Sequence, residues 1–252
     1  MARAPFRFNF SREAALPASP AHSPVAVVTG ANRGIGLEVV RRLAESGYTA
    51  VLGSRDPAKG EAAAEPLIRA GLDVVPAALD VDDDETVTAL ARWLTAEYGR
   101  CDVLVNNAAI LYDTWQRPAT ADLDVVRRAL ETNLLGAWRT AQALVPLLRD
   151  SPHPRIVNVS SGGGSISGMG AGAPAYCVSK AALNASTRML AADLRGHGVL
   201  VNAVCPGWVA TDMGGPGGRP VAEGARSVMW AVELPDNGPT GGFFRDGRPL
   251  DW

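Results

Sequence analysis

The segment TGANRGIG, residues 29–36, stands between the short apolar run VAVV, residues 25–28, and a helical pattern that begins with LEVVRRLA. A glycine-rich turn between a strand and a helix is the setting in which backbone N–H groups can hold a phosphate. Gly30 permits the tight turn, Gly34 lets the backbone approach a pyrophosphate, and Gly36 lets the helix pack close to the sheet. The segment therefore predicts a strand, a phosphate-binding turn and a helix in succession, although a turn into a helix also favours glycine for local reasons.

The same succession of a short apolar run and a helical pattern repeats along the chain. Apolar runs such as TAVLGS, DVVPAAL, CDVLVNNA, RIVNVSS and VLVNAVCPG alternate with helical segments, which include long ones at about 120–149 and 174–196. Such short runs are typical of parallel strands buried on both faces. A last helix near 221–233 and the strand GGFFRDG complete the series. Residues 25–252 are therefore predicted to form one α/β domain, a doubly wound Rossmann fold with a mostly parallel, seven-stranded sheet.

The composition restricts the classes of partner. With 252 residues, 47% of them hydrophobic and 20% charged, the chain suits one large domain with a sizeable core. The formal net charge of −2 gives no basic field for nucleic acid or for an anionic membrane surface, which leaves small molecules as the expected partners. The chain has 3 His and no Cys-x-x-Cys, so a metal site has no support.

The N-terminal residues 1–24 differ in character from the rest. They contain Arg and Phe but no continuous apolar stretch, and so lack the core of a secretory signal. We expect a flexible extension, with packing against the domain or a neighbour as the alternative. No run approaches the ~20 apolar residues of a membrane span. Cys101, Cys177 and Cys205 each lie in an apolar segment, as expected for buried thiols in a reducing compartment. These observations predict a cytoplasmic location.

A Tyr and a Lys four positions apart occur in AYCVSK, residues 175–180. Only Lys59 and Lys180 are lysines among the 24 Lys plus Arg. The ammonium of Lys is a compact point charge and the guanidinium of Arg is planar, so a catalytic role would explain a Lys at position 180. On a helix, Tyr176 and Lys180 share one face. A phenol with a pKa near 10 exchanges protons poorly at neutral pH unless a cation stabilises the phenolate. The two residues are thus either a catalytic acid and the cation that stabilises its phenolate, or a Tyr and a Lys on an ordinary helix surface.

Several motifs occur in a fixed order along the chain. The spacing Gly-x-x-x-Gly-x-Gly at 30–36 is followed by NNAA at 106–109, NVSS at 158–161, Tyr-x-x-x-Lys at 176–180 and PGWVATDM at 206–213. With these motifs the chain resembles the short-chain dehydrogenase/reductase family from residue 25 to its C-terminus. The stretches TGANRGIGLEVVRRLA, SRD, DVLVNNAAI and GPTGGFFRDGRPLDW are most similar to the carbonyl reductase branch. The resemblance implies a Rossmann fold and hydride transfer between a nicotinamide cofactor and a carbonyl compound.

The resemblance also implies four catalytic residues. Tyr176 is expected to act as general acid or base with Lys180 beside it. Ser161 is expected to hydrogen bond the substrate carbonyl, and Asn133 to hold a water that joins Lys180 to solvent, although an Asn in a helix can also simply face solvent. Ser161 lies two residues further from Tyr176 than is usual in the family, so Ser165 is the second candidate for its role.

The end of the second strand, GSRD, decides which dinucleotide the resemblance implies. Ser54 stands where NAD-using relatives commonly carry Asp, and Arg55 and Arg33 can form charge-assisted bonds to a 2′-phosphate. Asp56 is expected to cap the helix that follows. NADP is therefore the predicted cofactor. Its predicted binding residues are Gly30, Asn32, Arg33, Gly34, Ile35, Gly36, Ser54, Arg55, Asp80, Val81, Asn107, Ala108, Tyr176, Lys180, Pro206, Gly207, Val209 and Thr211.

Two further polar residues near this site have structural alternatives. Asp80 resembles the adenine-contacting Asp of the family, and capping of the next helix is nearly as good an account. Asn106 resembles a structural Asn that bridges neighbouring strands.

The predicted function is the reversible, NADPH-dependent reduction of a ketone or aldehyde to an alcohol; the alternative is a catalytically silent NADP-sensing module. Because the segment after Pro206 is short and rich in Gly, we expect an open, apolar substrate cleft bounded by Ser161, Met169, Trp208 and Met213. Closure of MGGPGGRP would instead bring Arg219 to a carboxylate. The long insertion before the catalytic Tyr of monomeric relatives is absent here, so a homodimer or tetramer is predicted.

Overall fold

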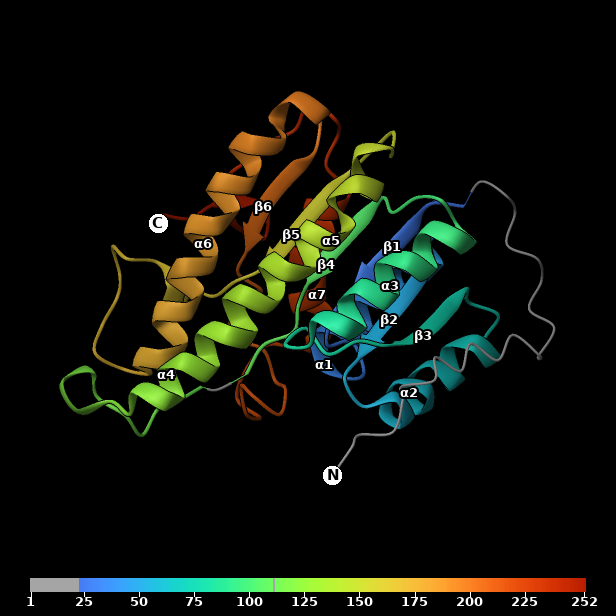
Figure 1. Cartoon of the computed structure of the whole chain (residues 1–252). Helices are drawn as coiled ribbons and strands as arrows, with labels where there is room; N and C mark the ends of the chain where they lie inside the picture. Colours follow the sequence, from blue (N-terminus) through green and yellow to red (C-terminus); the bar gives the residue numbers. More distant parts are fainter. Residues whose placement is uncertain (1–22, 111) are drawn as a thin grey trace.

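A computed structural model describes residues 23–110 and 112–252. Residues 1–22, most of the predicted extension, lie outside the described residues. The described chain forms one sheet with helices on both faces (Figure 1). The strands are β1 (Val25–Val28), β2 (Thr49–Ser54), β3 (Val74–Ala78), β4 (Val103–Asn106), β5 (Arg155–Val159), β6 (Leu200–Val204), β7 (Phe243–Arg245) and β8 (Arg248–Pro249). The α-helices are α1 (Gly34–Glu45), α2 (Pro57–Arg69), α3 (Asp84–Glu97), α4 (Leu123–Leu130), α5 (Ala137–Arg149), α6 (Pro174–Leu194) and α7 (Val221–Val232).

The sheet confirms the predicted doubly wound fold. Its strands are hydrogen bonded in the order β3-β2-β1-β4-β5-β6-β7-β8, and the pairs from β3 to β7 are parallel. All residues of β1, β2, β4, β5 and β6 are buried, as their bare apolar sequences require. The order reverses between β1 and β4, so the segments that follow these two strands diverge and leave a crevice at the carboxyl edge, where such sheets bind ligands.

The strand count differs from the prediction. Among the described residues the sheet has eight strands, and the prediction of seven missed β8, which pairs antiparallel with β7. Asp246 and Gly247 both have positive φ, at 51° and 76°, and form the tight turn that brings the chain back. An Asp-Gly pair is a common hairpin turn, and only two residues follow it in the ladder, which is too few to show a period-2 pattern.

Two apolar layers hold the helices to the sheet. Buried side chains of α3, α5 and α6 pack on one face, with Leu90, Leu144 and Leu194 fully enclosed. Residues of α1, α2 and α7 pack on the other face, around Leu43 and Val228. Figure 1 shows α3, α5 and α6 in front of the strands and α7 behind them. Within the described residues, the structure has no helix of the length and apolarity that a membrane crossing needs.

The predicted long helix at about 120–149 contains a change of helical type. α4 and α5 are joined without a break by a π-helical segment, Glu131–Gly136, in which Asn133 is buried. A Cβ atom at Gly136 would lie 2.7 Å from Cγ2 of Val81, so glycine lets this segment approach the loop after β3. Single π turns inside α-helices occur often at functional sites.

Candidate active site

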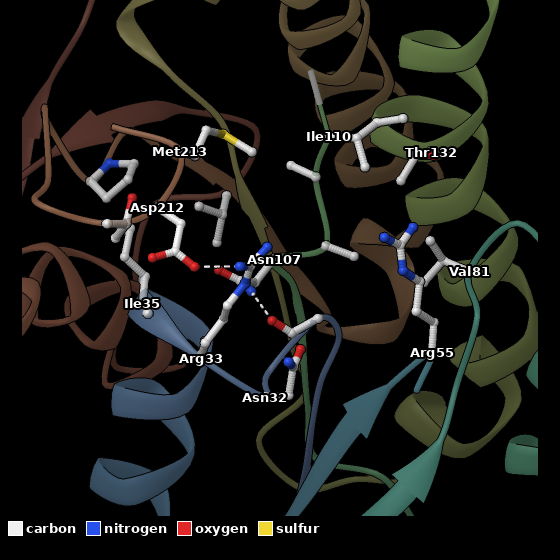
Figure 2. A pocket seen from close by; sticks show the side chains of 18 of the residues that line it. Asn32, Arg33, Ile35, Arg55, Val81, Asn107, Ile110, Thr132, Asp212 and Met213 are labelled. Carbon is white, nitrogen blue, oxygen red and sulfur yellow. Dashed lines mark hydrogen bonds and ion pairs between the residues drawn. The ribbon is translucent and has the colours of Figure 1, made fainter. Parts of the chain in front are cut away.

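A cavity of about 460 Å³ opens at the carboxyl edge of the sheet, at the point where the strand order reverses. It extends from the glycine-rich turn after β1 to the first turns of α6. Figure 2 shows Asn32, Arg33 and Arg55 among its lining residues. The predicted site residues that line it are Gly30, Asn32, Arg33, Gly34, Ile35, Gly36, Arg55, Asp80, Val81, Asn107, Ala108, Tyr176, Lys180, Pro206, Thr211 and Met213. Those outside its lining are Ser54, Asn133, Ser161, Met169, Gly207, Trp208 and Val209.

The glycine-rich turn is shaped by close contacts with the segment after β4. Gly30 has a φ of +61°, and a Cβ atom there would lie 2.8 Å from Cα of Ala108. A Cβ atom at Gly36 would lie 2.5 Å from Nδ2 of Asn107. The Asn107 amide group donates hydrogen bonds to the carbonyls of Thr29 (2.9 Å) and Gly30 (3.0 Å). Only glycine fits at Gly30 and Gly36, and the turn is held open next to the cavity.

The first turn of α1 faces this cavity without a cap of its own. Arg33, its N-cap residue, makes no capping hydrogen bond through its side chain, and the first turn contains no acidic residue. Because free N–H groups and the helix dipole favour negative charge, this turn suits the phosphates of a ligand. Together with the close-packed glycines, it fits a dinucleotide.

The two arginines predicted to select the cofactor differ in their partners. Arg33 forms an exposed ion pair with Asp212, from the segment after β6, across the cavity mouth. Arg55 follows the end of β2, lies beside Val81 in Figure 2, and forms no ion pair within the described chain. Arg55 is therefore free to bind a phosphate, whereas Arg33 would have to leave Asp212 or bind while paired.

Ser54 and Asp56 have local roles in the structure. The Ser54 hydroxyl is buried and donates to the backbone carbonyl of Asp56 at 2.7 Å, so its side chain is turned away from the cavity lining. Asp56 caps α2 as predicted, and its carboxylate accepts from the Lys59 amide at 3.2 Å. The amide hydrogen bond from Lys59 lowers the pKa of Asp56.

The structure bears on the structural alternatives considered for Asp80 and Asn106. Asp80 lines the cavity, and α3 is capped by Asp83, whose carboxylate accepts from the Glu85 amide at 2.9 Å; the capping role considered for Asp80 is therefore wrong. Asn106 bridges strands as predicted, since its amide donates to Oδ1 of Asn158 at 2.9 Å between β4 and β5.

The opposite end of the cavity carries Tyr176 and Lys180, both on α6. Lys180 is buried, its Nζ donates to the Val159 carbonyl at 2.8 Å, and it lies 5.7 Å from the centre of the Tyr176 ring. Burial raises the pKa of Tyr176 to about 12, which a hydrogen bond with the Ser161 side chain partly opposes. Burial lowers the pKa of Lys180 to about 8. At neutral pH the phenol therefore keeps its proton.

Ser161 rather than Ser165 lies beside the phenol. The Ser161 hydroxyl hydrogen bonds Tyr176 and also accepts from the Gly163 amide at 3.1 Å, at the end of β5. Ser165 is instead hydrogen bonded to Ser167 at 3.0 Å in an exposed position. A short 3-10 turn, Gly162–Gly164, follows Ser161, whose side chain caps it.

Both ends of the Asn133 side-chain amide hydrogen bond protein groups. Its Oδ1 accepts from the Ile110 amide at 2.8 Å, and its Nδ2 donates to the Ile110 carbonyl at 3.1 Å and to the Ser179 hydroxyl at 2.9 Å. Ser179 in turn donates to the Tyr176 carbonyl at 2.7 Å. The side chain thus joins the segment after β4 to α6, and the alternative in which Asn133 faces solvent is wrong because it is 1% exposed.

Only part of the predicted substrate pocket lines the cavity. Met213 lines it, whereas Trp208 is exposed and packs on its own loop, where its indole N–H donates to the Gly214 carbonyl at 2.7 Å. Met169 lies in the loop after β5 and is one-third exposed. Arg219 makes two ionic hydrogen bonds, of 2.8 and 2.9 Å, with the carboxylate of Asp246.

Three residues that contribute to the site were not predicted from the sequence. Asp212 is next to the predicted Thr211, but nothing in TDM indicates a partner in the glycine-rich turn. Tyr112 and Asp113 follow β4, and both contact the first turn of α6. Their partners lie more than 60 positions away, and no local periodicity or motif spacing signals such a contact.

The fold, the glycine-rich turn and the Tyr-Lys pair define an oxidoreductase of the short-chain type, and the comparison with known families agrees. A family model described as short chain dehydrogenase matches residues 24–219. The chain belongs to the short-chain dehydrogenase/reductase family, as its motifs predict.

Individual relatives resemble the chain over most of its length. The pig (Sus scrofa) protein named carbonyl reductase [NADPH] 1 is 34% identical over 275 residues, which cover 90% of this chain and 94% of the pig protein. The structure of NADPH-bound carbonyl reductase from chicken fatty liver is 29% identical, with a TM-score of 0.82 over 92% of this chain and 100% of that one. Salutaridine reductase from Papaver somniferum is 31% identical, with a TM-score of 0.78 over 88% and 99% of the two chains.

Proposed function

We propose that the protein is an NADPH-dependent carbonyl reductase that converts a ketone or aldehyde to an alcohol. The observation that carries the proposal is the arrangement at the chemical end of the cavity. There a half-buried, protonated phenol, Tyr176, is hydrogen bonded to Ser161 and stands beside the buried ammonium of Lys180. The names of the pig and chicken relatives, both carbonyl reductases with NADPH, support the same reaction.

The chain's own residues would hold the cofactor in a defined order. The open first turn of α1 and the glycines at Gly30 and Gly36 would receive the pyrophosphate. Arg55, free of other partners in the described chain, would bind the 2′-phosphate, and Asp80 would contact the adenosine. Bound NADPH supplies the hydride for the reduction.

The protein's part in the chemistry is the delivery of a proton. Tyr176 would donate its phenolic proton to the carbonyl oxygen as that oxygen gains negative charge, and Ser161 would hydrogen bond the same oxygen. Lys180 would stabilise the phenolate left behind, because its buried ammonium lies beside the ring. Asn133 would act through its contacts with Ile110 and Ser179, which hold the segment next to Tyr176.

The substrate side favours an uncharged, apolar carbonyl compound. Met213, Trp208 and Met169 are all exposed or partly exposed near the carboxyl edge and offer apolar surface. Arg219, the cation that a closing loop would bring to a carboxylate, is occupied by Asp246. Aromatic or extended aliphatic ketones and aldehydes are therefore the proposed substrate class, and short keto acids are disfavoured.

A homo-oligomer is part of the proposal. Helices α5 and α6 flank a cavity of about 490 Å³ lined by Trp138, Gln142, Val145, Met189, Leu190, Asp193 and Leu194. Met189 is 62% exposed. A second copy packed on this face would bury these groups, and sedimentation of the purified protein would measure the resulting mass. A cytoplasmic location, which suits the free thiols of Cys101, Cys177 and Cys205, completes the proposal.

The direct test is NADPH consumption with a panel of carbonyl compounds. We expect turnover with an aryl ketone or aldehyde and much slower turnover with a short keto acid. Tight NADPH binding without turnover on any member of the panel would favour the NADP-sensing module instead. Preference for the keto acid, lost in Arg219→Ala, would contradict the proposed open cleft.

A further inference from the structure

The helix that carries Tyr176 and Lys180 begins without a cap from its own sequence. Ala173, the N-cap residue of α6, has a left-handed conformation (φ 47°, ψ 57°) and makes no capping hydrogen bond through its side chain. A left-handed backbone is unfavourable for a residue other than glycine and persists only where the surroundings impose it. Pro174 at the first helical position has no N–H to satisfy. The next two amides, of Ala175 and Tyr176, need acceptors.

Both acceptors come from one carboxylate that lies far away in the sequence. Oδ2 of Asp113 accepts from the Ala175 amide and Oδ1 from the Tyr176 amide, each at 3.0 Å. Asp113 is 0% exposed, and the side-chain amide of Gln116 donates to its Oδ2 at 2.9 Å. The carboxylate therefore does for α6 what a neighbouring Asp or Ser does at an ordinary N-cap, from a different element.

The segment from Tyr112 to Asp122 contacts the catalytic turn through more than this cap. The ring of Tyr112 meets the ring of Tyr176 edge to face, with 5.2 Å between their centres and 85° between their planes. Gln116 accepts from the Asp122 amide at 2.8 Å, and Asp122 caps α4. The backbone and the ring of Tyr176 are thus both held by a segment that lies in neither the NADP motif nor the Tyr-Lys motif.

We propose that Asp113 is a positioning residue for Tyr176. This inference rests on the proposed function, in which Tyr176 delivers a proton to a carbonyl oxygen. Asp113 binds the amide of Tyr176 itself, so it fixes the start of the turn from which the phenol projects. A misplacement of about 1 Å at a reacting group is enough to slow a reaction by about 100-fold. Asp113 hydrogen bonds the start of α6 and not the glycine-rich turn or Arg55, so we expect only a small change in cofactor affinity when it is replaced.

The experiment compares two carboxylate caps on the same protein. Asp113→Ala removes the cap of α6, and Asp83→Ala, the matched control, removes the cap of α3, which is an ordinary N-cap outside the cavity lining. We expect Asp113→Ala to lower kcat for an aryl ketone about 30- to 100-fold, with the Kd for NADPH within about twofold of wild type. Asp83→Ala should lower Tm and leave kcat within about twofold.

A conservative variant keeps the test valid where Asp113→Ala folds poorly. Asp113→Asn has one acceptor oxygen, so it can serve one of the two amides, and we expect a kcat between those of wild type and Asp113→Ala. Equal kcat in Asp113→Asn, Asp83→Ala and wild type would overturn the inference, because Asp113 would then act on stability alone.

A second readout separates this inference from the proposed function. Amide hydrogen exchange in residues 175–180 should become faster in Asp113→Asn and stay unchanged in Asp83→Ala, whatever the substrate. Unchanged exchange there in Asp113→Asn would overturn the inference even in an active enzyme. A wild-type protein that reduces no carbonyl compound would contradict the proposed function, while faster exchange in the same variant would still support the cap.

Discussion

Helices α1 and α6 both begin at the carboxyl edge of the sheet, and neither is capped by the side chain of its own N-cap residue. The first turn of α1 is left open toward the cavity. The first turn of α6 is closed by Asp113, 62 positions before Ala175. By contrast, α2, α3 and α4 are capped in the ordinary way by the Asp that precedes each of them.

The difference between these helix ends follows from what each must do. An open first turn keeps N–H donors for a ligand, at some loss of stability when no ligand is bound. A closed first turn has no donors to offer, and the turn becomes a fixed support for the side chains that project from it. The same local feature, a missing N-cap, therefore has opposite meanings at the two ends of one cavity.

The largest effect on activity is expected at the closed end of the cavity, where α6 begins. Tyr176→Phe removes only the phenolic hydroxyl, so reduction of an aryl ketone should fall by about 1,000-fold or more, within the range known for loss of a general acid. NADPH binding, which depends on the other end, should stay within a few-fold of wild type. Steady-state kinetics and a fluorescence titration of NADPH measure the two quantities, and near wild-type turnover would rule out Tyr176 as the proton donor.

A smaller effect, on cofactor affinity, is expected when the open first turn of α1 is given a capping side chain. Arg33→Asp gives α1 the kind of cap that α2, α3 and α4 have, which should stabilise the free protein by about 1 kcal/mol relative to Arg33→Ala. Its carboxylate takes N–H donors from the pyrophosphate and repels it, so the Kd for NADPH should rise about 100-fold. Arg33→Ala is the control for loss of the guanidinium. Equal affinity in the two variants would show that the turn does not bind phosphate.

The sequence predicts most features of the open end, at the first turn of α1, and few features of the closed end, at the first turn of α6. The glycine-rich turn is a local pattern, because Gly30, Gly34 and Gly36 all lie within one strand-turn-helix unit. The parallel sheet is likewise readable from bare apolar runs. The pairing of Asp113 with the amides of Ala175 and Tyr176 is different, since it joins a side chain to a backbone more than 60 positions away.

Other differences between sequence and structure have similar causes. Asp80 is a candidate cap of α3 from the sequence because LDVDDDE contains several acidic residues. Only the backbone conformation shows that Asp83 is the cap. The π-helical segment with Asn133 keeps the apolar spacing of an α-helix at both of its ends, so it cannot be distinguished in the sequence. The ion pair of Arg33 with Asp212 depends on how the segment after β6 folds back over the cavity.

The two arginines at the open end differ in availability, and a third prediction uses that difference. Arg55→Ala should raise the Kd for NADPH about 10- to 100-fold, the range for loss of a hydrogen bond to a charged group, and leave the Kd for NADH nearly unchanged. Arg33→Ala should have a smaller effect, because Asp212 already holds that guanidinium. Titrations with both cofactors measure this. A larger loss in Arg33→Ala would assign the 2′-phosphate to Arg33.

The substitution Ser54→Asp, which the sequence also suggests as a route to NADH, is less informative. Ser54 is buried, and its hydroxyl is bonded to the Asp56 backbone, so a carboxylate there would be buried beside Asp56. Loss of NADPH binding in that variant would not distinguish selectivity from misfolding, whereas exposed Arg55 can be replaced without that cost.

The smallest effect concerns stability at the closed end, where Lys180 is buried for function. Its pKa falls from 10.5 to about 8, so at pH 7 the folded state carries a charge that burial disfavours by about 3 kcal/mol. Lys180→Met removes this penalty and also the hydrogen bond from the ammonium to the Val159 carbonyl, a loss of about 1.5 to 3 kcal/mol for a charged donor. The net expectation is a variant about 1 kcal/mol more stable than wild type at pH 7, and inactive.

The sign of the pH dependence provides the check on this last prediction. Between pH 8 and 10.5 the unfolded chain binds the lysine proton and the folded protein does not, so the Lys180 penalty in wild type fades as pH rises through this range. The advantage of Lys180→Met should therefore be present at pH 7 and vanish or reverse by about pH 10. Urea unfolding of both proteins at the two pH values measures the difference. A variant that is less stable than wild type at pH 7 would show that the ammonium stabilises the first turns of α6, and that the closed end is built for stability as well as for placement.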